Sequence, residues 1–272
     1  MSTLEEYFAA KASGDLIAWK FQVEAAAKFS MSLGEVEEAI FGAGLLPARY
    51  QRNRNMLSTE QQHKLFRSSV AVIGCGGLGG YILEQLARLG VGKIIAIDPD
   101  VFEEHNLNRQ LLSSPRLLGA SKAETARARV NDINPALNLV AIQEAFDADN
   151  GADLVAGADV VVDAVDNVAA RKALDVVCRE LKVPLVHGAI AGWYGHVSTQ
   201  YPGDEIIGKL YGNADETPGV EKQLGNPSFT PGAAASFQVA EVCKIISGEG
   251  ELLRNRKLHI DLLAMETEDV PF

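Results

Sequence analysis

One segment, residues 70–122, constrains the fold of this chain more strongly than any other. The apolar run Val70-Ala71-Val72-Ile73 breaks into Gly74-Cys75-Gly76-Gly77-Leu78-Gly79-Gly80, and a second apolar run, Ile94-Ile95-Ala96-Ile97, ends at Asp98. This order predicts a strand, a glycine turn, a helix and a second strand that ends in an acid. Glycines let the backbone approach a phosphate, the helix amino terminus offers free N–H groups, and the acid can hold ribose hydroxyls. The segment therefore predicts a nucleotide-binding unit.

Two cations follow the second predicted strand. Arg109 lies in the run Asn106-Leu107-Asn108-Arg109-Gln110, and Lys122 follows further along the chain. An ordinary nicotinamide-binding unit does not need them, because the helix amino terminus already holds its pyrophosphate. A triphosphate under nucleophilic attack does need fixed cations, because charge builds on the phosphoryl oxygens and on the leaving pyrophosphate. Arg109 and Lys122 therefore favour ATP chemistry over two alternatives, a NAD-dependent oxidoreductase and a non-catalytic nucleotide-binding scaffold of the same fold.

Further motifs occur in an order that is typical of one family. In chain order they are Arg49-Tyr50-x-Arg52-Asn53, Gly74-x-Gly76-Gly77-Leu78-Gly79, Asp98-x-Asp100, Asn106-Leu107-Asn108-Arg109-Gln110, Gly119-x-x-Lys122, Asn134-Pro135 and Asp163-x-x-Asp166-Asn167. From about residue 49 to residue 272 the chain resembles the ubiquitin-activating enzyme superfamily, in its bacterial branch of sulfur-carrier adenylyltransferases (the MoeB, ThiF and HesA type). The resemblance implies a homodimer that uses ATP to adenylate the C-terminal glycine carboxylate of a small ubiquitin-like sulfur-carrier protein ending in Gly-Gly. Pyrophosphate is then released, and a separate sulfur donor completes the thiocarboxylate.

The resemblance also implies roles for individual residues. It assigns nucleotide binding to Gly74, Gly76, Gly77, Gly79, Asp98, Asp100, Asn106, Arg109 and Lys122, with Asp98 as the ribose contact. It assigns catalysis to Arg109, Lys122 and Arg52, and Arg52 would reach the nucleotide of the neighbouring subunit. Considered without the family, Arg52 is an ordinary solvated arginine. Asn106 either orients the α-phosphate region or caps the turn before Leu107.

Asp163-Ala164-Val165-Asp166-Asn167 ends a predicted strand that should lie beside the first one. Ligands of open α/β sheets bind at the carboxyl ends of strands where the strand order changes direction. Asp166 could therefore hold the Mg²⁺ that accompanies ATP, because this hard cation prefers carboxylate oxygen. The alternative is that Asp166 caps the helix beginning near Asn167. With the upstream motifs present we predict the magnesium role, and we expect Asp163 to be structural.

The cysteines differ from those of many relatives, which carry two Cys-x-x-Cys pairs for a structural zinc ion. This chain has three cysteines, at positions 75, 178 and 243, and neither pair. We therefore expect no zinc site of four thiolates. Residues 201–231 contain no cysteine, so we expect activation to stop at the acyl-adenylate without a covalent bond between enzyme and carrier.

Composition limits the other classes of partner. The formal net charge of −11 disfavours a nucleic-acid surface, which requires clustered Lys and Arg. No apolar run approaches the roughly 20 residues of a membrane-spanning helix. The start Met1-Ser2-Thr3-Leu4-Glu5-Glu6 is acidic and does not resemble an export signal. We expect a cytoplasmic protein that binds neither nucleic acid nor membrane.

Elsewhere apolar runs alternate with helical stretches, which predicts an α/β fold, a Rossmann-like and mainly parallel sheet with helices on both faces. The predicted strands are residues 70–73, 93–98, 139–143, 160–163, 185–190 and 192–200; the predicted helices are residues 61–66, 79–89, 121–133, 167–181 and 233–246. Residues 201–231 have no clear period and form the longest predicted loop, a candidate binding loop.

Residues 1–48 differ from the ATP-binding adenylation domain that we expect at residues 49–272. Two short helices are predicted here, and Ser32 with Glu35 forms a capping box that opens the second one. Glu35, Glu37 and Glu38 stand where a DNA-reading helix would carry basic or amide side chains. We expect this helical module to dock a partner or to support a dimer.

Overall fold

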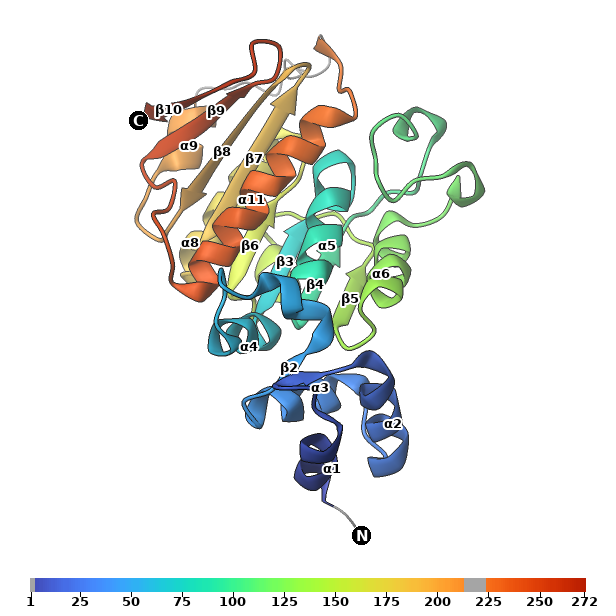
Figure 1. Cartoon of the computed structure of the whole chain (residues 1–272). Coiled ribbons are helices and arrows are strands. Elements are labelled where there is room, and N and C mark those ends of the chain that lie inside the picture. Colours follow the sequence, from blue (N-terminus) through green and yellow to red (C-terminus); the bar gives the residue numbers. More distant parts are fainter. Residues whose placement is uncertain (1–2, 213–223) are drawn as a thin grey trace.

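A mixed sheet forms the centre of the molecule (Figure 1). The computed structural model describes residues 3–212 and 224–272, and within them eight strands follow the order β10-β9-β8-β7-β6-β3-β4-β5. The strands are β3 (Ser69–Ile73), β4 (Lys93–Ile97), β5 (Asn138–Ile142), β6 (Val160–Asp163), β7 (Leu185–Ala191), β8 (Tyr194–Gln200), β9 (Arg256–Asp261) and β10 (Glu266–Pro271). The pairs from β5 to β7 are parallel, and those from β7 to β10 are antiparallel. The predicted α/β class with a mainly parallel sheet is confirmed.

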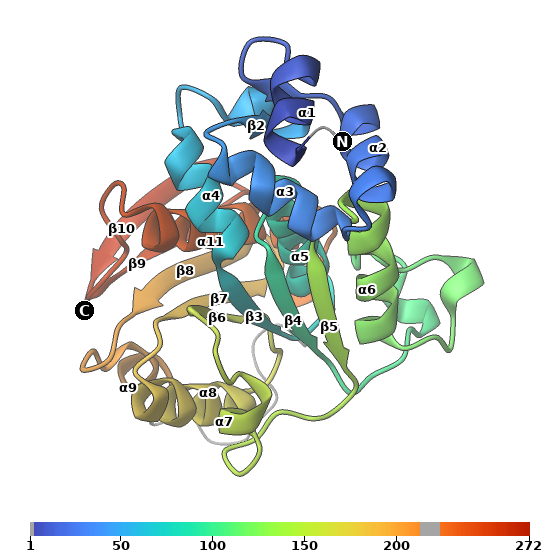
Figure 2. The same cartoon turned by 90° about the horizontal axis from the view of Figure 1, so that it is seen from below.

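Helices cover both faces of this sheet (Figure 2). One face carries α4 (Thr59–Arg67), α5 (Gly77–Leu89), α6 (Lys122–Ile133) and α11 (Phe229–Ser247), and the other carries α7 (Gly151–Leu154), α8 (Val168–Leu181) and α9 (Ile206–Tyr211). Successive residues of β3 explain both layers. Val70 and Val72 join the core beneath α5, whereas Ala71 and Ile73 join the core beneath α8. Alternating side chains of a buried parallel strand supply both cores.

The N-terminal module contains α1 (Leu4–Lys11), α2 (Trp19–Phe29), α3 (Leu33–Gly42) and a short parallel pair, β1 (Leu16–Ile17) with β2 (Leu46–Pro47). It has a hydrophobic cluster of its own, which includes Phe8, Ile17 and Ile40. The predicted capping box of Ser32 and Glu35 is present at the start of α3. The prediction of two helices was incomplete, because Thr3 and Glu6 form a capping box that begins α1.

Two other predictions need correction. The hairpin of β9 and β10 was not predicted, because most of its residues are charged or partly exposed and give no apolar run. The predicted loop 201–231 contains α9 and the beginning of α11, and its residues 213–223 lie outside the described residues. Among the helices that the structure describes, none combines the length and the apolar character that crossing a bilayer requires.

Candidate functional site

The glycine turn between β3 and α5 lies where β4 pairs with one side of β3 and β6 with the other. Gly74 has a φ of +97°, and a Cβ atom there would lie 2.5 Å from the carbonyl oxygen of Ala164. A Cβ atom on Gly79 would lie 1.8 Å from the carbonyl oxygen of Gly74. Both positions therefore require glycine. Gly76 is the N-cap of the 13-residue helix α5 and provides no side-chain cap, which leaves a helix terminus suited to an anion.

Three charged residues beside this turn form one connected group. Asp98, at the end of β4, accepts hydrogen bonds from the backbone N–H groups of Cys75 (2.7 Å) and Asp100 (2.8 Å). Burial raises the pKa of Asp98 above its usual range. The Nζ atom of Lys122 donates to the Asp100 carboxylate at 2.8 Å. Asp98 thus holds the glycine turn in place. Its carboxylate oxygens retain lone pairs that can accept further hydrogen bonds.

The loop after β4 brings Arg109 to the start of α5. The Nε atom of Arg109 lies 3.9 Å from the Cβ position of Gly77, and its Nη1 donates to the His105 carbonyl oxygen and the Asn108 side chain. Asn106 accepts a hydrogen bond from the backbone N–H of Glu103 at 3.0 Å, so it does cap this turn.

Gln110 is a residue to which the sequence assigned no role. It is buried against Gly76, and its Oε1 atom has no hydrogen-bond partner among the described residues. A buried acceptor without a partner is unfavourable unless a ligand or water satisfies it. Its position directly after Arg109 was the only sequence signal that could have pointed to it.

Asp166 follows β6, across the turn from the glycine loop. Its side chain is exposed, and no hydrogen bond or ion pair engages it within the part of the chain that the structure describes. Asn167 is the N-cap of α8 and accepts from the backbone N–H of Ala170 at 2.8 Å. The capping alternative for Asp166 was therefore wrong. Asp163 is fully buried and pairs with His187 instead of facing the open edge.

Arg52 is not brought to the site of its own chain. It is exposed on the 3-10 helix η1 (Ala48–Asn53). The ring of Tyr50, in the same turn, lies 2.7 Å from the Cβ position of Gly90, which is the C-cap of α5. Arg52 and the glycine turn consequently lie at opposite ends of α5.

The thiols are poorly suited to nucleophilic attack. Burial, followed by the negative charge of Asp98, raises the pKa of Cys75 well above its usual value. Burial raises the pKa of Cys178 to about 12 and also raises the pKa of Cys243. Because the thiolate is the nucleophilic form, none of these groups is activated in this structure.

The residues also fit a magnesium nucleotide. No group of three or more His, Cys, Asp or Glu that could hold a metal ion occurs within residues 3–212 and 224–272. Mg²⁺ commonly binds through one or two carboxylates together with substrate phosphates, so a single exposed carboxylate near the phosphate cradle suits it. The open helix terminus, the buried acid after β4, Arg109 and Asp166 define a nucleotide-binding protein equipped for phosphate chemistry.

The particular family follows from comparison with known proteins. The ThiF family matches residues 50–272, and the chain belongs to this family. It is 38% identical over 229 residues to the SAMP-activating enzyme E1 of Haloferax volcanii, across 82% of this chain and 84% of that protein. It is 31% identical to the molybdopterin-synthase adenylyltransferase of Haemophilus influenzae, across 82% of this chain and 93% of that protein. The adenylyltransferase and sulfurtransferase MOCS3 of Arabidopsis thaliana is 33% identical, but the chain spans only 49% of its length.

Solved structures support the same fold. E. coli MccB superimposes with a TM-score of 0.70 at 22% identity, over 82% of this chain and 71% of MccB. E. coli TcdA, a tRNA N6-threonylcarbamoyladenosine dehydratase, gives a TM-score of 0.63 at 24% identity, over 74% of this chain and 95% of TcdA. At these identities the similarity establishes the fold alone. Together with the family match, the relatives confirm the predicted superfamily and the class of enzyme, an ATP-dependent adenylyltransferase.

Proposed function

We propose that this adenylyltransferase activates the C-terminal glycine carboxylate of a small ubiquitin-like sulfur-carrier protein that ends in Gly-Gly. The observation that carries the proposal is the uncapped terminus of α5, with Arg109 beside it and Asp166 across the turn. The carboxylate attacks the α-phosphorus of ATP, a carboxyl–phosphate bond forms, and the bond to the β-phosphate breaks to release pyrophosphate. No general base is needed, because a carboxylate is ionised at neutral pH.

Each residue has a task in this reaction. The backbone of Gly74, Gly76, Gly77 and Gly79 cradles the phosphates, and Asp98 accepts the ribose hydroxyls. Arg109 and Lys122 stabilise the charge that builds on the phosphates, since fixed cations need no rearrangement in the transition state. Asp100 holds Lys122 until the nucleotide arrives. Asn106 keeps the loop of Arg109 in shape. Asp166 would hold Mg²⁺, which would neutralise phosphate charge when bound.

The same geometry supports a homodimer in which Arg52 acts across the interface. Arg52 lies near the carboxyl end of α5 and the glycine turn forms its amino end. A two-fold axis perpendicular to α5 would place the carboxyl end of this helix beside the amino end of α5 in the partner. The outer surface of α5 and α11 favours close approach, because it presents Gly232 beside Tyr81 and an exposed Phe237. Residues 1–48, as a separate helical module, would hold η1 for this contact.

The carrier would dock on an exposed apolar surface beside the glycine turn. Trp193 and Phe229 lie 4.6 Å apart between ring centres and are both more than two-fifths exposed. Leu263 is also exposed, and its neighbour Leu262 donates a backbone hydrogen bond to Trp193. Pro231, two residues after Phe229, lies 3.7 Å from the Cβ position of Gly77. A carrier seated here could extend its C-terminal tail to the phosphates, and a separate sulfur donor would act on the adenylate in the cytoplasm.

Pyrophosphate–ATP exchange with candidate carriers tests this function. Exchange should require Mg²⁺ and a carrier with an intact Gly-Gly terminus, and a carrier without its last glycine should be inert. Exchange that ignores the carrier terminus would contradict the proposal. Tight NAD binding without any exchange would favour the oxidoreductase, and nucleotide binding without exchange would favour the scaffold.

A further inference from the structure

A buried polar cluster adjoins the turn of Asp166, on the face of the sheet beneath α8 and α9. Its centre is His187, in the otherwise apolar strand β7. Both His187 and Asp163 are 0% exposed, and the Nδ1 atom of His187 lies 2.6 Å from Asp163 Oδ2. Isolating either polar side chain in this core would be unfavourable, so the contact is a specific feature of the fold.

Asp163 and Arg171 together hold the residue that precedes Asp166. The second carboxylate oxygen of Asp163 accepts from the backbone N–H of Val165 at 3.1 Å. The Nη2 atom of Arg171 donates to the backbone carbonyl oxygen of Val165 at 2.8 Å, and its Nε lies 3.5 Å from Asp163. Both backbone polar groups of Val165 are thus fixed by buried side chains, which limits the freedom of Asp166 itself.

His187 connects this turn to a neighbouring strand and to α9. Its Nε2 atom lies 3.1 Å from Nε2 of His196, in β8, and 3.2 Å from the hydroxyl of Tyr211, in α9. When Nδ1 of a neutral His187 donates to Asp163, its Nε2 must accept from these groups. Burial lowers the pKa of His187 and lowers that of His196 to about 2, so both rings are neutral near pH 7. The resulting chain runs from α9 to the turn of Asp166.

We propose that His187 is a positioning residue, which through Asp163 and Val165 holds the turn of Asp166 in the conformation that binds the divalent cation. This inference rests on the proposed function for one assignment, that of Asp166 to the metal. The relay uses only side chains that lie outside the nucleotide cradle. A loss of His187 should therefore weaken metal binding more than nucleotide binding.

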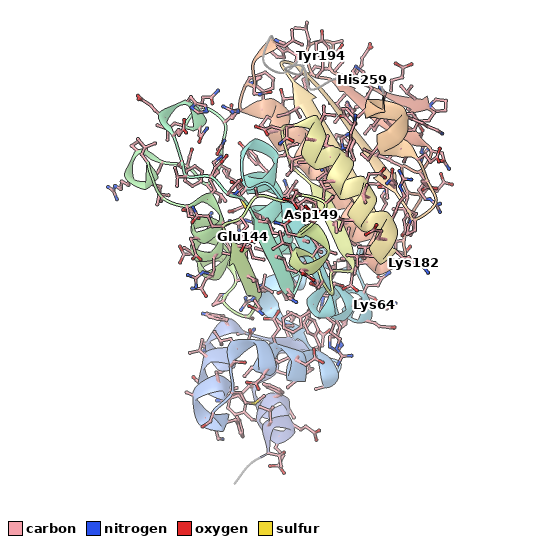
Figure 3. The ribbon with its side chains drawn as sticks, turned by 180° about the vertical axis from the view of Figure 1, so that it is seen from behind. Lys64, Glu144, Asp149, Lys182, Tyr194 and His259 are labelled. Atoms are coloured by element: carbon pink, nitrogen blue, oxygen red, sulfur yellow. The ribbon has the colours of Figure 1, made fainter. Side chains whose placement is uncertain are left out.

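The test compares His187→Leu, which cannot donate to Asp163, with His187→Asn, whose amide can replace Nδ1. The matched control is His259→Leu. His259 lies in β9 and stacks on Tyr194, with 6.1 Å between ring centres (Figure 3). It stands opposite His196 in the strand register, and its ring makes no hydrogen bond to the chain that runs through His187 among the described residues. Mn²⁺ binding is measured by electron paramagnetic resonance with a non-hydrolysable ATP analogue, and analogue binding alone by calorimetry.

We expect His187→Leu to weaken Mn²⁺ binding about 10-fold, the lower end of the effect of losing an outer-shell partner, while His187→Asn and His259→Leu stay near wild type. Unchanged Mn²⁺ binding in His187→Leu overturns the inference, as does an equal loss in all three variants. If His187→Leu does not fold, Tyr211→Phe removes one donor to His187 and should weaken Mn²⁺ binding measurably; no change in this variant also overturns the inference.

Asp166→Asn separates the two proposals. If it abolishes Mn²⁺ binding while His187→Leu does not weaken it, only the relay fails, and if Asp166→Asn has no effect, the metal assignment and the relay fail together.

Discussion

At the carboxyl ends of β3, β4 and β6 polar groups remain open to a ligand, whereas at the amino ends of the sheet several buried polar side chains bond to one another. The open edge carries the uncapped terminus of α5 and the exposed Asp166. At the closed edge the hydroxyl of Tyr50 donates to the buried Glu37 at 2.6 Å, and Asn134 donates to that same hydroxyl at 2.8 Å. Arg49 bonds to Asn134 and completes a network between the module and the domain.

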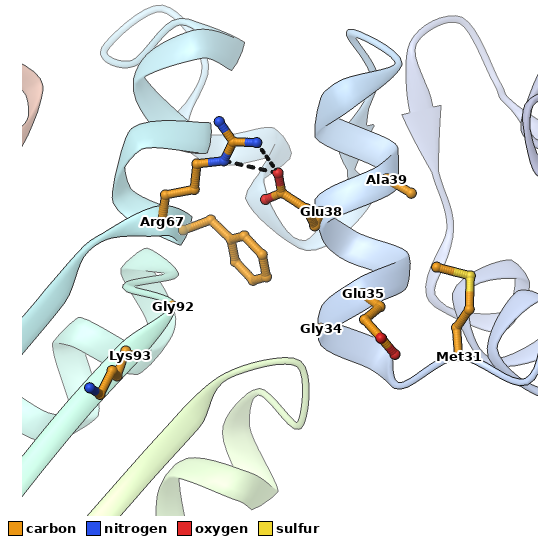
Figure 4. Close-up of a pocket in the computed structure, with 9 residues that line it drawn as sticks. Met31, Gly34, Glu35, Glu38, Ala39, Arg67, Gly92 and Lys93 are labelled. Carbon is orange, nitrogen blue, oxygen red and sulfur yellow. Dashed lines mark hydrogen bonds and ion pairs between the residues drawn. The ribbon is translucent and has the colours of Figure 1, made fainter.

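This difference separates two roles within one set of family motifs. Arg49, Tyr50 and Asn134 belong to the family pattern, and in this structure they connect η1 and the module to the domain. A groove lies at the closed edge, between α3 and the start of β4 (Figure 4). An ion pair in its lining, between Glu38 and Arg67, connects α3 to α4. We therefore propose that the chemistry takes place at the open edge and that the closed edge determines where Arg52 is presented.

The largest expected effect lies at the open edge. Arg109→Ala should lower carrier-dependent pyrophosphate exchange by about 10²-fold, because it removes one preorganised charge contact, and Lys122→Ala should do the same. The matched control is Arg116→Ala, which removes an exposed charge from the same loop region. Near-full exchange in both Arg109→Ala and Lys122→Ala would place the nucleotide elsewhere.

Subunit complementation tests whether Arg52, at the closed edge of one chain, contributes to the nucleotide site at the open edge of its partner. Arg52→Ala and Asp166→Ala should each be nearly inactive alone. An equal mixture should regain about one quarter of wild-type exchange, because half of the dimers are mixed and each has one complete site. Failure to recover, in a sample that demonstrably exchanges subunits, would remove Arg52 from the partner's site.

Asn134→Ala should affect stability instead of catalysis. Asn134 is 1% exposed, and its loss removes one hydrogen bond from the hydroxyl of Tyr50 and one from Arg49. Removing one member of a buried hydrogen-bonded set costs about 1–3 kcal/mol of unfolding free energy. Urea denaturation would measure this loss, while exchange at low temperature should remain within a few-fold of wild type. An inactive but fully stable Asn134→Ala variant would contradict the claim that the closed edge is structural.

A smaller effect concerns pH. Burial raises the pKa of Glu37, although Arg49 and Tyr50 oppose the shift. A carboxyl group with a raised folded-state pKa stabilises the fold most below its unfolded pKa, and this contribution is lost as pH rises through the folded value. The free energy of unfolding of the wild type should therefore fall as pH rises above 4.5, the usual pKa of a glutamate carboxyl, and Glu37→Gln should flatten this slope. Urea midpoints over this pH range measure it, and equal slopes in both proteins would count against the assignment.

The last prediction is that no covalent adduct forms between enzyme and carrier. Because all three thiols have raised pKa values, enzyme and carrier should not form a thioester. Intact mass after reaction with ATP and carrier, under non-reducing conditions, should show the free enzyme. Cys75→Ser should keep adenylate formation. A reducible enzyme–carrier adduct that disappears on mutation of one cysteine would contradict this expectation.

Much of the fold could be predicted because its signals are local. The glycine spacing around Gly76 and the apolar runs of the parallel strands are properties of short segments. The hairpin of β9 and β10 lacked such a run, and its strands form only by pairing with β8 and with each other. Helix α1 was missed because its eight residues, Leu4–Lys11, are too few for a clear apolar period.

The site was predictable only in part, for a similar reason. The sequence predicted Asp98 at the end of the βαβ unit and Arg109 in the loop that follows it, and the structure places both beside the glycine turn. It left open whether Asp166 holds magnesium or caps the next helix, because the capping residue depends on where the turn ends, and in the structure the cap is Asn167. The partners of His187 come from β6, β8 and α9, and no pattern along the chain connects them.

The central claim, that the nucleotide binds at the open edge, is tested most directly by hydrogen–deuterium exchange of backbone amides. A magnesium complex of a non-hydrolysable ATP analogue should protect residues 74–80 and 98–110, and should leave residues 34–47 unchanged. NAD at the same concentration should protect neither region. Protection of residues 34–47 by the analogue, or protection of residues 74–80 by NAD and not by the analogue, would contradict the account.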